Sequence, residues 1–303
     1  MMLKPRAALA AAAVFVALCA PCAAAPADDE AGEVPFTFEK GYVVVAGRIK
    51  GKEPAEFILS TGYEHSTADP LQAQKYELQG FYTGVGPITG RNDRTVSFTR
   101  VPGVRVGPAD ASLDMFYAST AAAGRALGRE IFGVLGSDFF KGRTVQFDFG
   151  KRVLRFLDKA SAAALREKAA GAPGAAVLRM GEREDIFGRP LTLPLVEKVV
   201  FDGRPGKVMF DTGVVTVVAL SASAAKRLGY EPPPEKGAAR DDTVRALDVG
   251  PVKLSGVPVI IYPKGSPAEA RLGDDGALAG SVFLQNFVAT FDYRGKVVIL
   301  ERL

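Results

Sequence analysis

The sequence predicts an all-β protein in which one chain forms two similar lobes. Short β-branched runs punctuated by Gly and Pro recur along it, for example at residues 42–45, 257–261 and 297–300. An apolar run ending in Ser60-Thr61-Gly62 is repeated, later in the chain, by one ending in Asp211-Thr212-Gly213. The segments downstream of the two triplets also correspond in order, which is the pattern of an internal duplication.

Three further pairs of segments carry the duplication: 106–108 with 249–251, 136–139 with 280–283, and 147–149 with 291–293. A strand-like run follows the last segment of each copy. The first copy spans residues 36–157 and the second 190–303. A single β-sandwich with strands that resemble one another by chance is the alternative, and the conserved order of the blocks argues against it.

Residues 158–189 are predicted to connect the lobes. The Ala-rich stretch 158–169 has basic residues near its end and predicts a helix, and the Gly- and Pro-containing stretch 171–174 predicts a flexible turn after it.

The first 27 residues have the pattern of a secretory signal. Lys4 and Arg6 precede an apolar stretch over 7–18 that is too short to span a bilayer. Small residues then lead to a predicted cleavage after Ala27, which implies export to the periplasm or beyond. Lipidation at Cys19 or Cys22 is a weaker alternative. Both cysteines lie in this signal, so the mature chain has no disulfide.

Composition narrows the range of partners. The formal net charge is +4 and no Lys/Arg cluster stands out, which argues against nucleic acid as a partner. No second apolar stretch is long enough to span a membrane, so the mature chain is expected to be soluble. One histidine and no mature cysteine leave only carboxylates as ligands, and we expect neither a metal nor a cofactor.

An apolar strand that ends in Asp-Thr-Gly and is followed downstream by two apolar residues and Gly resembles the aspartic peptidases. Val134-Leu135-Gly136 and Leu278-Ala279-Gly280 provide that second segment in the two copies. The segments 136–156 and 280–300 resemble, more narrowly, the bacterial exported retropepsin-like group. The resemblance covers nearly all of the mature chain.

This resemblance implies an acid-protease fold: two β-barrel-like lobes with the triplets at the base of the cleft between them. Thr61 and Thr212 would hydrogen-bond across the interface, and Gly62 and Gly213 would allow the two turns to approach closely. Gly136 and Gly280 would support these turns from below. Residues of about 80–98, which include Gly84, Gly86 and Gly90 and few large apolar side chains, look like a β-hairpin flap over the cleft.

Ser60 stands where the family has its first catalytic Asp. The peptidase reaction uses two carboxylates about 3 Å apart that share a proton, so that one acts as base and the other as acid. A serine has no accessible ionisation, and losing a general acid or base costs about 10²- to 10⁴-fold. Asp211 therefore remains as the one candidate catalytic residue of this pair.

Other residues near the triplets also depart from the aspartic-peptidase pattern and favour impaired catalysis. Val214 and Val215 follow the second triplet, where the family has a hydroxyl that orients the carboxylate, and here the first hydroxyl is Thr216. Glu64 is a possible but disfavoured substitute acid. The matched pair Asp148 and Asp292 is expected to bind turn backbone.

Two other polar residues are also expected to be structural. Asp138 should cap a short helix. His65, the one histidine, should be a turn or strand residue.

Three hypotheses follow. In the first, the chain is an exported, catalytically impaired member of the family that binds an extended peptide or unfolded polypeptide in the interlobe cleft. The second is an active endopeptidase that uses Asp211 with a substitute acid or by homodimerisation. The third is a non-catalytic periplasmic structural or interaction module. A monomer is expected, because the covalent first lobe competes with any second chain for the interface.

Overall fold

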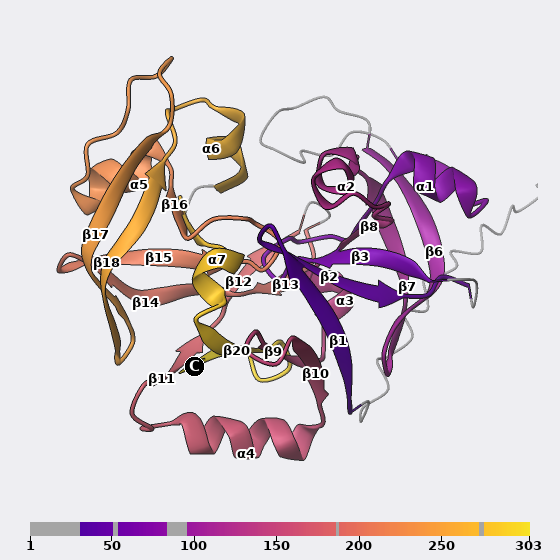
Figure 1. Ribbon diagram of the computed structural model, residues 1–303, viewed down its shortest axis with the longest axis horizontal. Helices are drawn as coiled ribbons and strands as arrows, with labels where there is room; N and C mark the ends of the chain where they lie inside the picture. Colours follow the sequence, from indigo (N-terminus) through magenta and orange to yellow (C-terminus); the bar gives the residue numbers. More distant parts are fainter. Residues whose placement is uncertain (1–30, 51–53, 84–95, 186–187, 273–275) are drawn as a thin grey trace, which may run out of the picture.

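The computed structural model describes residues 31–50, 54–83, 96–185, 188–272 and 276–303. The predicted signal and the predicted flap glycines Gly84, Gly86 and Gly90 lie outside these residues. Within them, strands dominate and the helices are short (Figure 1).

The first lobe combines one run of paired strands with three short helices. Its strands are β1 (Gly32–Glu39), β2 (Tyr42–Gly47), β3 (Ala55–Leu59), β4 (Thr67–Ala68), β5 (Gly80–Thr83), β6 (Val96–Val106), β7 (Ala109–Tyr117) and β8 (Gly133–Leu135). Its helices are α1 (Pro70–Lys75), α2 (Ala121–Leu127) and α3 (Ser137–Phe140). The strands β5 and β6, which flank the predicted flap segment, pair antiparallel from Gly80↔Thr99 to Thr83↔Val96.

The second lobe is a closed barrel in the strand order β14-β15-β19-β16-β18-β17. These strands are β14 (Leu195–Phe201), β15 (Arg204–Phe210), β16 (Val218–Leu220), β17 (Arg240–Val249), β18 (Val252–Ile261) and β19 (Ala277–Ala279). The accompanying helices are α5 (Ala222–Leu228), α6 (Pro267–Leu272) and α7 (Ser281–Leu284).

A shared sheet joins the lobes. The repeated segments β9 (Thr144–Asp148) and β20 (Phe287–Asp292) pair antiparallel, flanked by β10 (Val153–Leu157) on one side and by β21 (Val297–Arg302) and β11 (Ala175–Arg179) on the other. Through β10 and β1 this sheet continues into the first lobe. The connector supplies α4 (Lys159–Ala169), which lies along the outside of the sheet, and β12 (Gly181–Glu184), which pairs with β13 (Pro190–Leu193) at the start of the second copy (Figure 1).

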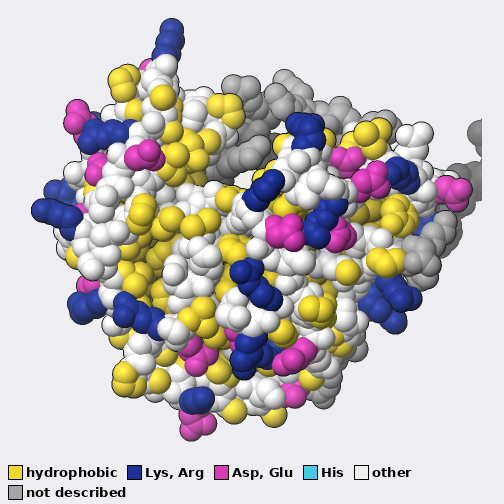
Figure 2. Space-filling view, in the orientation of Figure 1, with side chains coloured by type: hydrophobic (Ala, Val, Ile, Leu, Met, Phe, Trp, Pro, Cys, Tyr) yellow, Lys and Arg dark blue, Asp and Glu magenta, His cyan; other side chains and the backbone are white. Residues whose placement is uncertain are grey.

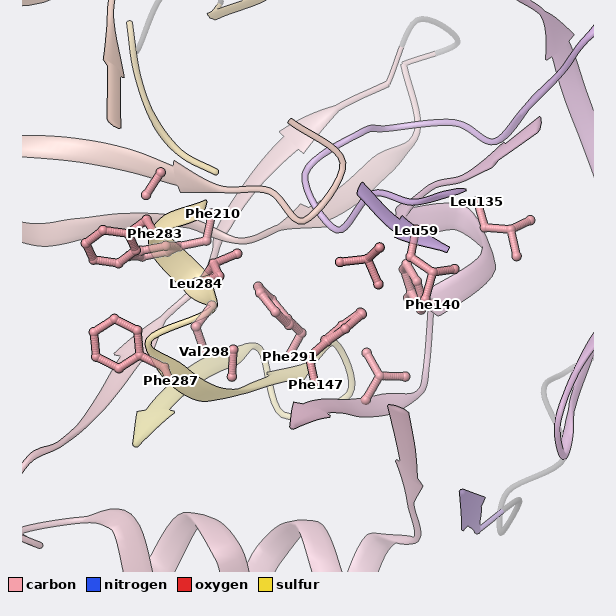
Figure 3. Packing of buried hydrophobic residues seen from close by; sticks show 14 of the residues in the cluster. Leu59, Leu135, Phe140, Phe147, Phe210, Phe283, Leu284, Phe287, Phe291 and Val298 are labelled. Carbon is pink, nitrogen blue, oxygen red and sulfur yellow. The ribbon is translucent and has the colours of Figure 1, made fainter. Parts of the chain in front are cut away.

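One buried apolar cluster runs through both lobes. Figure 3 shows Leu59 of the first lobe and Phe210 of the second on the side of the core away from α4, with Phe147 and Phe291 between them and the helix. These two rings meet edge to face, with centroids 5.8 Å apart, across the β9–β20 pair. The core therefore continues from one lobe to the other beneath the two triplets.

The predicted fold class, an all-β protein of two lobes, is confirmed. The short β-branched segments form strands. The connector forms the predicted helix, which begins at the N-cap Asp158. The described helices are too short or too polar to cross a membrane.

Candidate active site

The two triplets occupy equivalent positions at the ends of parallel strand pairs. In the first lobe β3 pairs with β8, and the Ser60 N–H donates to the carbonyl of Leu135 at 2.9 Å. In the second lobe β15 pairs with β19, and the Asp211 N–H donates to the carbonyl of Ala279 at 3.0 Å. Residues 60 and 211 are thus held in the same way, each by its own lobe.

The threonines of the triplets interlock across the interface. The Thr61 hydroxyl donates to the carbonyl of Phe210 at 3.0 Å, and the Thr212 hydroxyl donates to the carbonyl of Leu59 at 2.8 Å. Each hydroxyl oxygen also accepts the backbone N–H of the other threonine at 3.2 Å. Because both side chains are fully buried, these four bonds fix the relative position of the two turns.

Glycine is required after each threonine because the opposing residue lies against it. A Cβ at Gly62 would come within 2.8 Å of the Asp211 Cβ, and a Cβ at Gly213 within 2.4 Å of the Ser60 Cβ. The two contacts mirror one another, so the side chains at 60 and 211 occupy equivalent places on either side of the interface.

Ser60 and Asp211 meet directly. The Ser60 hydroxyl donates to Asp211 Oδ1 at 2.7 Å, and the Gly213 N–H donates to the same oxygen at 2.8 Å. Both side chains are only 4% exposed. Burial raises the pKa of Asp211 above its usual value, although the hydrogen bonds from Gly213, Ser60 and Gly62 oppose that shift. The site therefore holds one carboxyl group with a raised pKa and one hydroxyl.

The glycines predicted to support the turns lie against the residues that follow the triplets. A Cβ at Gly136 would come within 2.7 Å of the Tyr63 carbonyl oxygen, and one at Gly280 within 2.3 Å of the Val214 carbonyl oxygen. The next residue in each lobe donates its N–H to the same carbonyl: Ser137 to Tyr63 at 2.8 Å and Ser281 to Val214 at 2.9 Å.

Apolar side chains are exposed beside the site. Tyr63 is 46% exposed, and Val214 and Val215 are 37% and 43% exposed. Val215 also packs against the turn between β1 and β2, where a Cβ on Gly41 would come within 2.4 Å of it. In the space-filling view the surface is indented between the lobes, on the side opposite α4 (Figure 2). We call these three exposed residues, which directly follow the triplets in the sequence, the apolar rim.

Asp138 does not cap a helix as predicted from the sequence. The N-cap position of α3 is Gly136, which makes no side-chain cap bond. Asp138 instead accepts the Ser66 backbone N–H and the Ser66 hydroxyl at 2.6 Å, and burial raises its pKa despite these bonds. The Ser66 hydroxyl oxygen in turn accepts the Gly136 N–H at 2.9 Å. This cluster ties the turn after the first triplet to α3.

Tyr293 belongs to the site, and the sequence analysis missed it. Its hydroxyl donates to the carbonyl of Thr61 at 2.7 Å, so a residue of the second lobe supports the first-lobe triplet. Burial and the nearby charges of Asp211 and Asp138 raise its pKa well above the usual value for tyrosine. The repeat contains the signal: the matching residue of the first copy is Phe149, which has no hydroxyl.

The remaining candidate groups contact residues outside the Ser60–Asp211 pair. Asp148 accepts the Lys151 N–H at 2.9 Å and Asp292 accepts the Gly295 N–H at 2.7 Å, which confirms their predicted turn-binding role. His65 is largely buried, with its ring against Phe116 and its Nε2 3.9 Å from a carboxylate oxygen of Asp185. Among the described residues, no group of three or more His, Cys, Asp or Glu side chains is placed to hold a metal.

Comparison with known proteins gives distant structural likenesses only. No family model matches the chain, and neither does any curated protein. Among solved structures, the chain is similar to basic 7S globulin from soybean, with a TM-score of 0.47 and 11% identity over 90% of this chain and 95% of that one. The assignment of the two-lobed fold rests on the strand pairing described above.

Proposed function

We propose that this chain is an exported protein of the aspartyl-protease type, whose interlobe cleft binds extended peptides and whose capacity to hydrolyse them is severely reduced. The observation that carries the proposal is the 2.7 Å hydrogen bond from the Ser60 hydroxyl to Asp211. It supports a site in which a hydroxyl stands where the peptidase mechanism needs a second carboxyl group.

A single carboxyl group cannot perform both halves of the reaction. As an anion, Asp211 could draw a proton from an attacking water, but no acid would then protonate the substrate carbonyl. As a neutral acid, it could donate that proton but could not activate the water. The Ser60 hydroxyl ionises far too weakly to act as the second acid or base at ordinary pH. One of the two proton transfers in each catalytic cycle therefore has no catalytic group.

Peptide binding is supported by features that survive the loss of the carboxylate. The threonine contacts still hold the two turns together, and the rim side chains Tyr63, Val214 and Val215 offer apolar surface to a ligand. Among the described strands, β5 is the last of its sheet and pairs with β6 alone, which leaves one edge for an added strand.

The decisive experiment restores the second carboxylate. The chain without residues 1–27, Ser60→Asp and Asp211→Asn are each incubated with an unfolded polypeptide between pH 3 and 7. Because residues 60 and 211 lie in mirrored places, Ser60→Asp should raise cleavage by about 10²- to 10⁴-fold. The unsubstituted chain should stay near the background set by Asp211→Asn.

Two results would contradict the proposal. Robust cleavage by the unsubstituted chain that Asp211→Asn abolishes would show an active endopeptidase. No gain in Ser60→Asp, with its circular dichroism unchanged, would show that position 60 is not the cause of the deficit. Peptide binding is tested separately on a peptide array: Val214→Arg should abolish specific binding, whereas Leu71→Arg, at an exposed position on α1, should not.

The peptide array also tests the alternative that the chain is a structural module whose cleft binds no peptide. If no peptide binds the unsubstituted chain, the binding half of the proposal is wrong.

A further inference from the structure

A basic hollow lies on the first lobe, on a part of β6 separate from its pairing with β5. Its volume is about 430 Å³, within the usual range for small-molecule sites of about 300–1,000 Å³. Its walls are formed by Arg48, Lys50, Pro102, Gly103, Arg105 and Asp110.

The backbone creates this hollow through an irregularity in the sheet. The pairing of β6 with β7 shifts register between Val101 and Val104, so Pro102 and Gly103 bulge out of the ladder. Lys50 reaches the bulge from the end of the neighbouring strand, and its N–H donates to the Pro102 carbonyl at 3.3 Å. Lys50 adopts a φ of 51°, a conformation that is uncommon for a residue with a side chain.

Three of the residues that line the hollow, Arg48, Lys50 and Arg105, carry a positive charge. Arg48 and Arg105 form a directly opposed pair with two backbone hydrogen bonds of 2.9 Å, and like charges in this arrangement are destabilising. Asp110 neutralises one of them, accepting from Arg105 Nη2 at 3.0 Å. The side chains of Arg48 and Lys50 make no hydrogen bond or ion pair with any described residue. Among the described residues that line the hollow, three cations against one carboxylate leave a surplus of two positive charges.

The second lobe shows that the fold does not need these cations. Its matching cross-strand pair is Asp248 with Lys253, where the first lobe has Arg105 with Asp110. Val200 pairs with Asp248 in the place where Arg48 pairs with Arg105. The same backbone arrangement is therefore built without a surplus of positive charge.

The two lobes also differ in charge at the turn that follows this pair, where the first lobe has Lys50 and the second has Asp202. Asp202 has a φ of 45°, close to that of Lys50, and its N–H donates to a strand carbonyl in the same way. Its carboxylate is held within the chain, by the Tyr230 hydroxyl at 2.8 Å and by the Ala246 N–H at 2.8 Å. Lys50 occupies the equivalent turn with an exposed ammonium group that no described residue neutralises.

From these observations we propose that the hollow binds the phosphate group of a small soluble molecule. A phosphate monoester carries a charge of about −1.5 to −2 at neutral pH, which matches the surplus of two. Guanidinium N–H groups of Arg48 and Arg105 donate to its oxygens, and the Lys50 ammonium group supplies the remaining charge. Pro102 and the aliphatic stems offer apolar contact to the organic part.

Calorimetric titration of the mature chain with inorganic phosphate and with glycerol 1-phosphate, at constant ionic strength in chloride, tests this site. Arg48→Gln and Lys50→Gln should each weaken binding about tenfold, the effect of losing one charge-assisted contact. Lys253→Gln removes the cation of the corresponding cross-strand pair in the second lobe and should leave binding unchanged. All three residues are exposed, so the variants should fold.

The proposal is overturned if neither phosphate binds, or if Lys253→Gln weakens binding as much as Arg48→Gln, because a general charge effect would then suffice. Co-sedimentation with phosphatidylglycerol vesicles separates a third case. Binding to vesicles without binding to either free phosphate would show attraction to an anionic surface and would also overturn the proposal. Asp211→Asn should bind phosphate as the unsubstituted chain does, since the hollow shares no residue with the triplets.

Discussion

The buried carboxyl group of Asp211 has a raised pKa, which makes the stability of the protein depend on pH. Burial favours the neutral acid in the folded state, whereas the unfolded chain ionises at the usual value. The stability that Asp211 contributes is therefore fully present below the unfolded pKa and is lost as the pH rises towards the folded one. The folded state disfavours the charged form of Asp211, so raising the pH towards neutral lowers the free energy of unfolding at this residue.

Asp211→Asn should remove that penalty. Because an amide oxygen can still accept from Ser60 and Gly213, we expect the variant to match the unsubstituted chain near pH 3 and to exceed it increasingly as the pH rises to 7. Urea denaturation at a series of pH values measures the difference.

Asp148→Asn is the opposite control. Burial alone would raise the pKa of Asp148, but hydrogen bonds from Lys151 and Arg155 hold it below its usual value. Its replacement should therefore cost most stability at neutral pH. A difference between Asp211→Asn and the parent that stays constant across this range would contradict the burial argument.

Whether the role of a single residue can be predicted from the sequence depends on the chemistry of its side chain. The serine at position 60 can be read directly, because the repeat aligns it with Asp211. The bond between Tyr293 and the Thr61 carbonyl cannot, because a hydroxyl is short-ranged and its partner depends on how the lobes dock. The prediction for Asp138 is wrong for a related reason. Its partner Ser66 is distant in sequence, whereas the start of a helix, which a carboxylate often caps, lies next to it.

At the scale of single elements, the two triplet turns act as one unit. Each threonine hydroxyl both donates to and accepts from the opposite turn, so removing one hydroxyl breaks bonds on both sides of the interface. The turns are thus structurally coupled whether or not the site performs chemistry.

Thr61→Val and Thr212→Val should each lower the free energy of unfolding by about 1–3 kcal/mol, the cost of leaving buried backbone groups unpaired. The double variant should lose less than the sum, with a coupling energy of about 0.5–3 kcal/mol, because the second substitution acts on a network already broken. Urea denaturation of the four proteins gives the cycle.

Thr99 provides a matched control for this coupling. It is fully buried and donates to the carbonyl of Gln79 at 2.8 Å within the first lobe, away from the interface. Thr99→Val and Thr212→Val should therefore add to within about 0.5 kcal/mol. Strict additivity of the Thr61 and Thr212 substitutions would show that the two turns are independent.

For the whole molecule, the shared sheet and the continuous core predict a single unfolding unit. The β9–β20 pair places Phe147 against Phe291, and further side-chain bonds cross it, including the Thr144 hydroxyl to Asp292 at 2.7 Å. Neither lobe can lose its half of this sheet without exposing the core of the other.

Phe291→Ala should destabilise both lobes together, by about 3–5 kcal/mol. Hydrogen exchange followed by mass spectrometry measures the two lobes separately: peptides from β6–β7 and from β17–β18 should lose protection by the same amount. Loss confined to the second lobe would show that the lobes unfold independently.

The global architecture was the part most open to sequence reasoning. Short β-branched runs and a duplicated order of motifs depend on many residues at once, so single exceptions do not mislead. The long-range pairing between β11 and β21 was beyond reach, because the connector sequence alone does not reveal that a strand within it joins the sheet. The charge contrast between Lys50 and Asp202 needed the structure to align the two turns.

The joining of both lobes on one chain allows residues 60 and 211 to differ. Two identical subunits meeting on a twofold axis would present the same residue from each side, and an extended ligand could lie across them in either direction with equal energy. Here one side presents a hydroxyl and the other a carboxyl group. The site therefore has polarity, and the two orientations of a bound chain are energetically distinct.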